Sequence, residues 1–225
     1  MTWSTPIEDK RMAADTKART FFEELWGDGD YWSLESSDHE RGRYAALLST
    51  IDGRRYPRAL ELGCGAGEFT RLVAPLADEL VALDVAPTAI KRAREQAGDL
   101  TCVRFLQENV MEYDARGNGP WDLVIVSETI YYLGWLYSFF DVAWLASELL
   151  AATRPGGRLL LADTQAVIED TLVRPWIIRT YHDLFSNVGF EVEGERLHRG
   201  IKDGVELDVL ISLYRHAAEA RSDAA

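Results

Sequence analysis

Cysteine is scarce in this sequence, which holds only Cys64 and Cys102 among 225 residues. Two cysteines cannot build a disulfide framework or, by themselves, a cysteine-based zinc site. Long hydrophobic runs are missing too, since no apolar stretch approaches the ~20 residues of a membrane-spanning helix. The first ten residues lack the basic start and apolar run of a secretion signal. We therefore expect a cytoplasmic protein that does not act at a membrane.

Basic residues are also in short supply. Lysine and arginine number 24 against 37 aspartates and glutamates, which gives a formal net charge of −13. Binding to nucleic acid or to an anionic membrane needs clustered lysine and arginine, so both partners are disfavoured. The hydrophobic share of 47% and the charged share of 27% are those of an ordinary globular protein. A small molecule is the expected partner, and no pattern indicates an oligomeric state.

Short apolar runs alternate with helical stretches from residue 58 onward. Such alternation predicts an α/β fold with a Rossmann-like, doubly wound sheet. The expected strands are residues 58–62, 80–84, 103–106, 121–126, 158–162, 190–197 and 206–214, seven in all with the last antiparallel. The expected helices are residues 8–25, 38–51, 69–76, 87–98, 136–153 and 174–188. We divide the chain into an N-terminal helical cap (1–57), a sheet domain (58–214) and a flexible tail (215–225).

A glycine-rich loop follows the first expected strand, at Gly63-Cys64-Gly65-Ala66-Gly67. Glycines let the chain turn tightly and let a ligand approach bare backbone. The dinucleotide fingerprint is Gly-x-Gly-x-x-Gly, which holds a pyrophosphate at a helix N-terminus. This loop has another spacing, and Glu61 and Glu68 flank it with negative charge. The loop therefore favours a ligand with a positive group over one with phosphates, and disfavours an NAD(P) or nucleotide-sugar oxidoreductase.

Two further strand ends carry polar residues suited to a nucleoside. Asp84 ends the second strand, 21 positions after Gly63, and can accept hydrogen bonds from ribose hydroxyls. Asn109 follows the third strand and can pair with the edge of an adenine. Ribose, adenine and a cationic amino-acid group without phosphates describe S-adenosylmethionine. The alternative is a plain strand–helix turn beside a solvated aspartate.

Residues 58–164 resemble the core of the class I S-adenosylmethionine-dependent methyltransferases. The matching segments are residues 60–67, 83–84, 105–109, 121–124 and 154–159. In that family the glycine loop and the acid before it hold the methionine part, and the acid of the second strand holds the ribose. Asn109 stands where the family commonly has aspartate. The resemblance implies these cofactor-binding residues: Glu61, Gly63, Cys64, Gly65, Gly67, Asp84, Val85, Asn109, Val110 and Ser127.

A narrower resemblance is to the NodS-type methyltransferases. The segments that carry it are Asp30-Tyr31-Trp32, residues 40–44, residues 127–133 and residues 174–181. Founding members of that family N-methylate a glucosamine amine on chitooligosaccharides, and their relatives act on assorted small molecules. The resemblance implies that Trp32 closes over the cofactor. Tyr31 replaces the usual proline, and His39 stands where an aromatic residue is common.

Glu128 is the candidate catalytic residue, because it follows the fourth strand directly, where such a sheet faces its substrate. Partly apolar surroundings would raise its pKa into the range useful for a base. The alternative is an exposed loop acid or a helix cap. His182 is the second candidate base, or else a surface histidine. Among the aromatic residues that follow, Tyr131 and Tyr132 are expected to stack on the acceptor, and Trp135 and Tyr137 to pack in the core.

The sequence thus predicts an S-adenosylmethionine-dependent methyltransferase for a small molecule, with S-adenosylhomocysteine as product. N-methylation of an amine, such as an amino sugar, is slightly favoured. The alternatives are O-methylation of a sugar or a phenol, and a cofactor-binding module without catalysis. No spacing of histidine, cysteine and acids suggests a metal.

Overall fold

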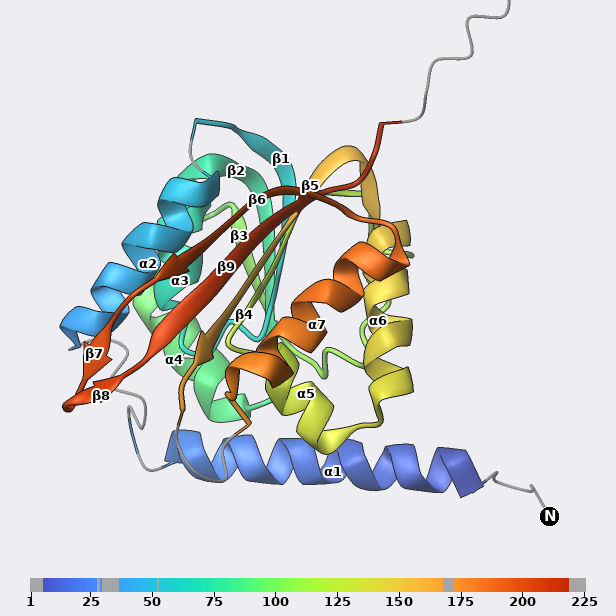
Figure 1. The fold of residues 1–225 in the computed structure, drawn as a ribbon. Helices are drawn as coiled ribbons and strands as arrows, with labels where there is room; N and C mark the ends of the chain where they lie inside the picture. The colour runs from blue at the N-terminus through green and yellow to red at the C-terminus, as the bar shows by residue number, and fades with distance from the viewer. Residues whose placement is uncertain (1–5, 28, 30–36, 52, 168–171, 219–225) are drawn as a thin grey trace, which may run out of the picture.

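The architecture is a seven-stranded sheet with helices on both faces (Figure 1). The computed structural model describes residues 6–27, 29, 37–51, 53–167 and 172–218. The strand order is β3-β2-β1-β4-β5-β9-β6. Five strands pair in parallel, and β9 runs antiparallel to both β5 and β6, which confirms the predicted fold. The strands are β1 (Tyr56–Leu62), β2 (Ala77–Asp84), β3 (Val103–Gln107), β4 (Trp121–Ser127), β5 (Thr153–Gln165), β6 (Glu191–His198) and β9 (Asp208–Arg215).

Helices cover the two faces and one end of the sheet. In Figure 1, α2 and α3 lie on one side of the sheet and α6 and α7 on the other, while α1 crosses below them. This lower end is the one at which the parallel strands finish. The helices are α1 (Pro6–Gly27), α2 (Asp38–Ile51), α3 (Glu68–Val73), α4 (Pro87–Ala97), α5 (Ile130–Leu136), α6 (Phe139–Ala152) and α7 (Pro175–Val188), with a 3₁₀ turn η1 (Ala74–Leu76).

The central strands are buried on both faces, which explains their continuous apolar sequences. Along β4, Val124 and Val126 pack into the cluster under α6 and α7, whereas Leu123 and Ile125 pack into the cluster under α2 and α3. Successive side chains of a strand point to opposite faces, so a strand covered on both sides needs apolar residues at every position. This rigid centre fixes the strand ends that carry the candidate site.

Two segments differ from the predictions. The expected helix 136–153 corresponds to α6, which begins only after a capping box between Ser138 and Asp141, and a separate helix that was not predicted, α5, precedes it. The expected strand 206–214 begins only at Asp208, and Glu206 belongs instead to an extra hairpin, β7 (Ile201–Lys202) and β8 (Val205–Glu206). Among the residues described, no helix has the length and apolarity to cross a membrane.

Candidate functional site

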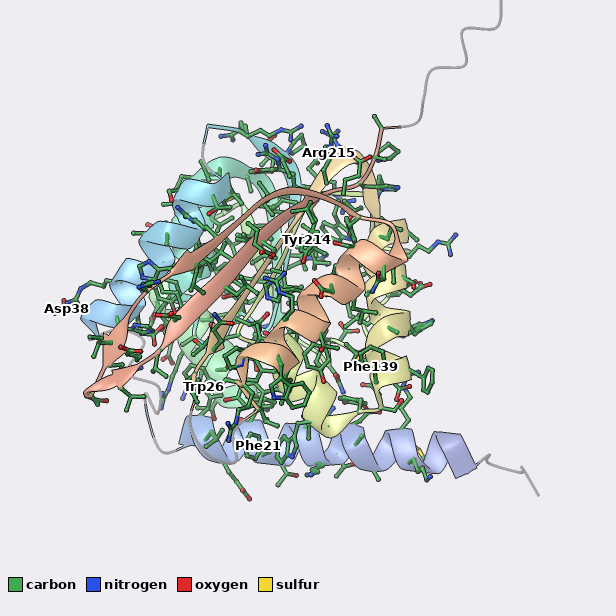
Figure 2. All side chains as sticks on the ribbon, viewed as in Figure 1. Phe21, Trp26, Asp38, Phe139, Tyr214 and Arg215 are labelled. Carbon is green, nitrogen blue, oxygen red and sulfur yellow. The ribbon has the colours of Figure 1, made fainter. Side chains whose placement is uncertain are left out.

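A cavity of about 280 Å³ lies between the carboxyl ends of the parallel strands and helix α1. Its walls come from the loops after β1, β2, β3 and β4, from α1 and α2, and from α5. Trp26 of α1 is one of its lining residues and lies on the side of the helix that faces the sheet (Figure 2). Open parallel sheets bind ligands at this edge. The predicted residues that line it are Glu61, Gly63, Cys64, Gly65, Asp84, Val85, Asn109, Val110, Ser127, Glu128, Tyr131 and Tyr132.

The glycine loop forms the floor of this cavity. Gly63 and Gly65 have φ of 78° and 55°, values that favour glycine. A side chain at Gly63 would collide with Thr129, and one at Gly65 would lie 2.9 Å from Trp26. Gly67, with φ of 85°, lies outside the cavity lining and packs against Ala93 and Phe105. Gly67 therefore allows close packing of loop and helix, and its contact with a cofactor stays a prediction.

Asp84 holds the glycine loop in place from the end of β2. Its Oδ2 accepts a hydrogen bond from the Gly65 amide at 3.0 Å, and its Oδ1 accepts one from the Ala86 amide at 2.9 Å. Burial raises the pKa of this carboxyl, and the backbone amides oppose the shift. Carboxylate oxygens have further lone pairs, so Asp84 can still accept bonds from hydroxyls of a ligand.

Glu61 is a buried acid beside the loop. It is 3% exposed, and its Oε2 accepts a hydrogen bond from Thr70 Oγ1 at 2.6 Å. Burial raises its pKa to about 8, and the charges of Glu68 and Asp84 add to the shift. Three acids around one loop make a place for a cation rather than for a phosphate.

The side-chain amide of Asn109 donates both of its hydrogens to the protein. Its Nδ2 donates to Asp15 Oδ1 at 2.9 Å and to the Tyr137 hydroxyl at 2.8 Å, and its Oδ1 accepts from the Met111 amide. Both amide hydrogens are used, so the structure leaves no donor for the predicted pairing with an adenine. Asp15 lies 94 positions away on α1, and no local sequence pattern reveals this contact.

Glu128 lies in a strained turn at the end of β4. Its φ is 54°, a left-handed value that is uncommon outside glycine and recurs at functional sites. Its Oε1 accepts hydrogen bonds from the amide and the hydroxyl of Thr164 at 2.9 and 3.0 Å. Its Oε2 accepts one from the Tyr131 hydroxyl at 2.9 Å. These hydrogen bonds fix the orientation of the Glu128 carboxyl within the cavity wall.

The pKa of Glu128 is raised to about 7, chiefly by burial, while the Arg43 guanidinium at 3.9 Å opposes the shift. This is the shift expected from a partly apolar setting. The alternative of a helix cap does not apply, because Thr129 is the N-cap of α5 and makes no side-chain cap bond.

Arg43 and its partners form a polar end of the cavity to which the sequence had assigned no role. Arg43 donates to Glu40 at 2.8 Å and to the Ser127 hydroxyl at 3.0 Å. Lys202 of the β7–β8 hairpin donates to the other Glu40 oxygen at 2.9 Å. The spacing of Glu40 and Arg43 on one helix face was visible in the sequence. The contact with a hairpin 162 positions away was not.

Aromatic rings form another part of the cavity wall. Tyr131 and Tyr132 line the cavity with ring centroids 4.5 Å apart, and Phe22 of α1 meets Tyr132 edge-on at 5.1 Å. Tyr137 is buried as expected, at 7% exposure. Trp135 is not a core residue: it is 39% exposed and packs at the surface against Phe21 and Lys17.

His182 is not the accessible base that the sequence allowed for, nor a surface histidine. It is 0% exposed, lies outside the cavity lining, and is held between Ser212 and Asp163. Burial lowers its pKa to about 3. The apolar pattern of residues 174–188 did not reveal this burial, because histidine is polar although His182 lies on the face of α7 that packs onto the sheet. Trp32, expected to close over the cofactor, lies outside the described residues.

Comparison with known proteins places the chain in a family. A family model described as Nodulation protein S (NodS) matches residues 15–164, most of the chain. The chain belongs to the NodS family. The resemblance predicted from the sequence is thereby confirmed.

Curated relatives in the NodS family share moderate identity with this chain. Nodulation protein S of Rhizobium tropici is 33% identical over 138 residues, which cover 60% of this chain and 56% of that protein. Its namesake in Bradyrhizobium diazoefficiens is 38% identical over 106 residues, covering 46% and 49%. The chain thus spans about half the length of the curated relatives it matches.

A solved structure supports the NodS-type fold. It is the N-methyltransferase NodS of Bradyrhizobium japonicum WM9 in complex with S-adenosyl-L-homocysteine, which superposes with a TM-score of 0.74 at 24% identity. The superposition covers 88% of this chain and 97% of that one. It extends the likeness over nearly the whole sheet and its helices.

Proposed function

We propose that this NodS-family protein transfers a methyl group from S-adenosylmethionine to the nitrogen of a small-molecule amine. The observation that carries the proposal is the position of Glu128, a carboxyl with a raised pKa in the same cavity as the glycine loop. The NodS structure from Bradyrhizobium japonicum is named an N-methyltransferase. A more distant relative, 26% identical, is named an O-methyltransferase, so transfer to oxygen is the alternative.

The residues present fit S-adenosylmethionine. Gly63 and Gly65 line the cavity and have φ values that favour glycine, so a ligand can approach the bare backbone of the loop. Asp84 offers acceptors for ribose hydroxyls, and buried Glu61 offers a counter-charge for an ammonium group. The basic residues of the lining, Arg43 and Lys202, are both paired with Glu40, and acids surround the glycine loop, so the loop does not attract a pyrophosphate. The cofactor, when bound, supplies an electrophilic methyl group on a sulfonium.

Glu128 acts on the acceptor. An ammonium group has no free electron pair, so its proton must leave before the nitrogen can attack a methyl carbon. Glu128 accepts that proton, the nitrogen forms the bond to carbon, and the sulfur–carbon bond breaks with its electrons going to sulfur. A carboxyl whose pKa is about 7 can accept a proton at neutral pH and release it again. Thr164 and Tyr131 fix its orientation, which counts because positioning supplies much of the rate.

The acceptor that fits best is an amino sugar. Tyr131 and Tyr132 offer ring faces for the apolar side of a sugar. Glu128 carries the charge that suits an ammonium beside them. We also propose that residues 1–57 cap the sheet domain of residues 58–214, since α1 and α2 both contribute to the cavity wall.

The test is methyl transfer from labelled S-adenosylmethionine to a panel of amino sugars and phenols, with products read by mass spectrometry. Glu128→Gln should lower kcat by about 10²- to 10⁴-fold, whereas calorimetric binding of S-adenosylhomocysteine should survive. The control is Glu112→Gln, because Glu112 is an exposed acid outside the cavity.

Unchanged turnover in Glu128→Gln contradicts the role of Glu128. Methylation on oxygen or carbon alone contradicts transfer to nitrogen. Binding of S-adenosylhomocysteine without any transfer supports the non-catalytic module. Binding of NAD⁺ in its place contradicts the cofactor.

A further inference from the structure

A buried polar array lies behind Glu128, on the face of the sheet that α7 covers (Figure 1). Asp163 of β5, His182 of α7 and Ser212 of β9 are each 0% exposed. His182 Nδ1 lies 2.8 Å from Ser212 Oγ, and its Nε2 lies 3.2 Å from Asp163 Oδ2. The three residue types are those of a hydrolase triad, but no substrate can reach them. Their hydrogen bonds therefore serve the protein itself.

Two residues nearer the surface, Arg179 and Glu195, determine which atom is the donor in each of these hydrogen bonds. Arg179 donates to both oxygens of Glu195 at 2.8 Å, which lowers the pKa of Glu195 and keeps it ionised. Ser212 lies 3.0 Å from Glu195 Oε2 and donates its hydrogen to that carboxylate. A hydroxyl has only one hydrogen. Ser212 must therefore accept from His182, so Nδ1 of His182 carries a proton.

The proton count at the other ring nitrogen follows. A neutral imidazole protonated at Nδ1 has a bare Nε2, which can only accept. The bond at 3.2 Å then needs a hydrogen on Asp163. An imidazolium beside an ionised Asp163 would hold the same number of protons, but it places two charges in a fully buried pair. Burial raises the pKa of Asp163 well above its usual range and lowers that of His182, which favours the uncharged pair.

We propose that Asp163 is a protonated positioning residue at neutral pH, hydrogen-bonded to His182, which supports the Glu128 turn without placing a negative charge behind it. The role in catalysis rests on the proposed function of Glu128. Asp163 is next in the chain to Thr164, which binds Glu128 Oε1 by its amide and its hydroxyl.

The proton on Asp163 affects Glu128 because Asp163 is one of the groups that face the Glu128 carboxyl. They are Arg43 and Glu40 from α2, Tyr131 from α5 and Asp163 from β5. An ionised Asp163 would oppose the ionisation of Glu128 and make it a carboxylate only at higher pH. Asp163 itself faces Arg43, and His182 faces Arg179, Glu195, Asp183 and Glu128. The neutral pair leaves Arg43 free to favour the carboxylate form of Glu128.

The direct test measures which ring nitrogen of His182 carries a proton, and it does not depend on methyl transfer. Protein labelled with ¹⁵N-histidine is examined at neutral pH by long-range ¹⁵N–¹H NMR, which distinguishes the ring tautomers. His182 is one of four histidines and is assigned by elimination with His39→Gln, His198→Gln and His216→Gln. The expected result is a neutral ring protonated at Nδ1. A ring protonated only at Nε2, or an imidazolium, overturns the proposal.

The functional test compares two variants by their kcat–pH profiles. Asp163→Asn keeps a donor toward His182 Nε2 and should leave the acidic limb within about half a unit of the wild type. Ser212→Ala removes the acceptor of Nδ1, so that the ring can donate to an ionised Asp163 instead. Its acidic limb should move to higher pH, and a shift of about one unit lowers the ionised fraction of Glu128 at pH 7 about fivefold. Ser147→Ala, at an exposed serine on α6, is the control.

A limb that moves to lower pH in Asp163→Asn shows that Asp163 was ionised and overturns the proposal. An unmoved limb in Ser212→Ala overturns the link to Glu128. If the wild type transfers no methyl group, the proposed function fails, while the tautomer of His182 still decides where the proton lies.

Discussion

At Glu128 the charge of a single carboxyl depends on the balance between burial and the polar groups that face it. Burial raises its pKa to about 7, and Arg43 and the Tyr131 hydroxyl act in the opposite direction. A base works only when it is ionised, so kcat should rise as pH increases through about 7 and then level off. Tyr131→Phe removes a bond to the ionised form, and its acidic limb should move to higher pH by less than about one unit.

This prediction is checked by kcat measured between pH 5 and pH 9. Tyr113→Phe is the matched control, because Tyr113 loses the same hydroxyl but does not line the cavity. An acidic limb that stays in place in Tyr131→Phe contradicts the hydrogen bond as a determinant of the pKa.

Glu61 links cofactor binding to a proton. Its pKa of about 8 keeps it mostly protonated at pH 7. A cationic ammonium group beside it favours the carboxylate, so binding of S-adenosylhomocysteine should release up to one proton. Calorimetry in buffers with different ionisation enthalpies measures that release. Glu61→Gln should abolish it, and equal release in the variant would show that another group supplies the proton.

The same carboxyl affects stability in a direction opposite to that of most acids. A pKa raised in the folded state means that the native protein binds more protons than the unfolded chain between about pH 4.5 and 8. The free energy of unfolding should therefore fall as pH rises through that window. Urea unfolding at pH 5 and pH 8 should show a smaller difference for Glu61→Gln than for the wild type. An unchanged difference would mean that Glu61 is not perturbed in the folded protein.

Residues at strand ends were predictable, and residues joined across the fold were not. Asp84 and Glu128 follow apolar runs, so the order of strands alone places them at one edge. Asn109 also lies there, but its bond to Asp15 depends on how α1 crosses the sheet. His182 differs for a similar reason, since its burial depends on how α7 rotates onto β5 and β9.

At the scale of elements, the packing of α5 against α7 depends on one glycine. A side chain at Gly134 would collide with the Tyr181 hydroxyl. Gly134→Ala should destabilise the protein by about 1–3 kcal/mol, as overpacking does, and should disturb Tyr131 on the same helix. Gly194→Ala is the control, because nothing lies within 4 Å of its added carbon. Denaturant unfolding measures both, and equal stabilities would contradict a close α5–α7 contact.

Helix and strand boundaries were predictable where the sequence carries local signals. Residues 38–51 form α2 as expected, and Pro87 begins α4. Helix α5 was not predicted, and the start of α6 was placed too early although Ser138 and Asp141 form a capping box, because the apolar pattern continues across the break between them. The β7–β8 hairpin was missed because its strands have two residues each and too few apolar positions to show a period.

For the molecule as a whole, the excess of acid extends into the candidate binding cavity. Among the residues that the structure describes, the cavity lining holds five acidic side chains and two that are permanently basic: Glu40, Glu61, Glu68, Asp84 and Glu128 against Arg43 and Lys202. The whole chain is also acidic, with a formal net charge of −13. Charges of one sign in and around a cleft attract ligands of the other sign.

Salt should therefore weaken the binding of a cationic acceptor. The Debye length falls from about 30 Å at 0.01 M salt to about 10 Å at 0.1 M, which screens most of the acidic surface. We expect the Kd of an amino sugar to rise several-fold over that range, while the Kd of its neutral N-acetyl analogue stays nearly constant. Titration calorimetry on both ligands measures the difference. A parallel response would show that the cavity recognises the sugar without its charge, and would favour transfer to oxygen over transfer to nitrogen.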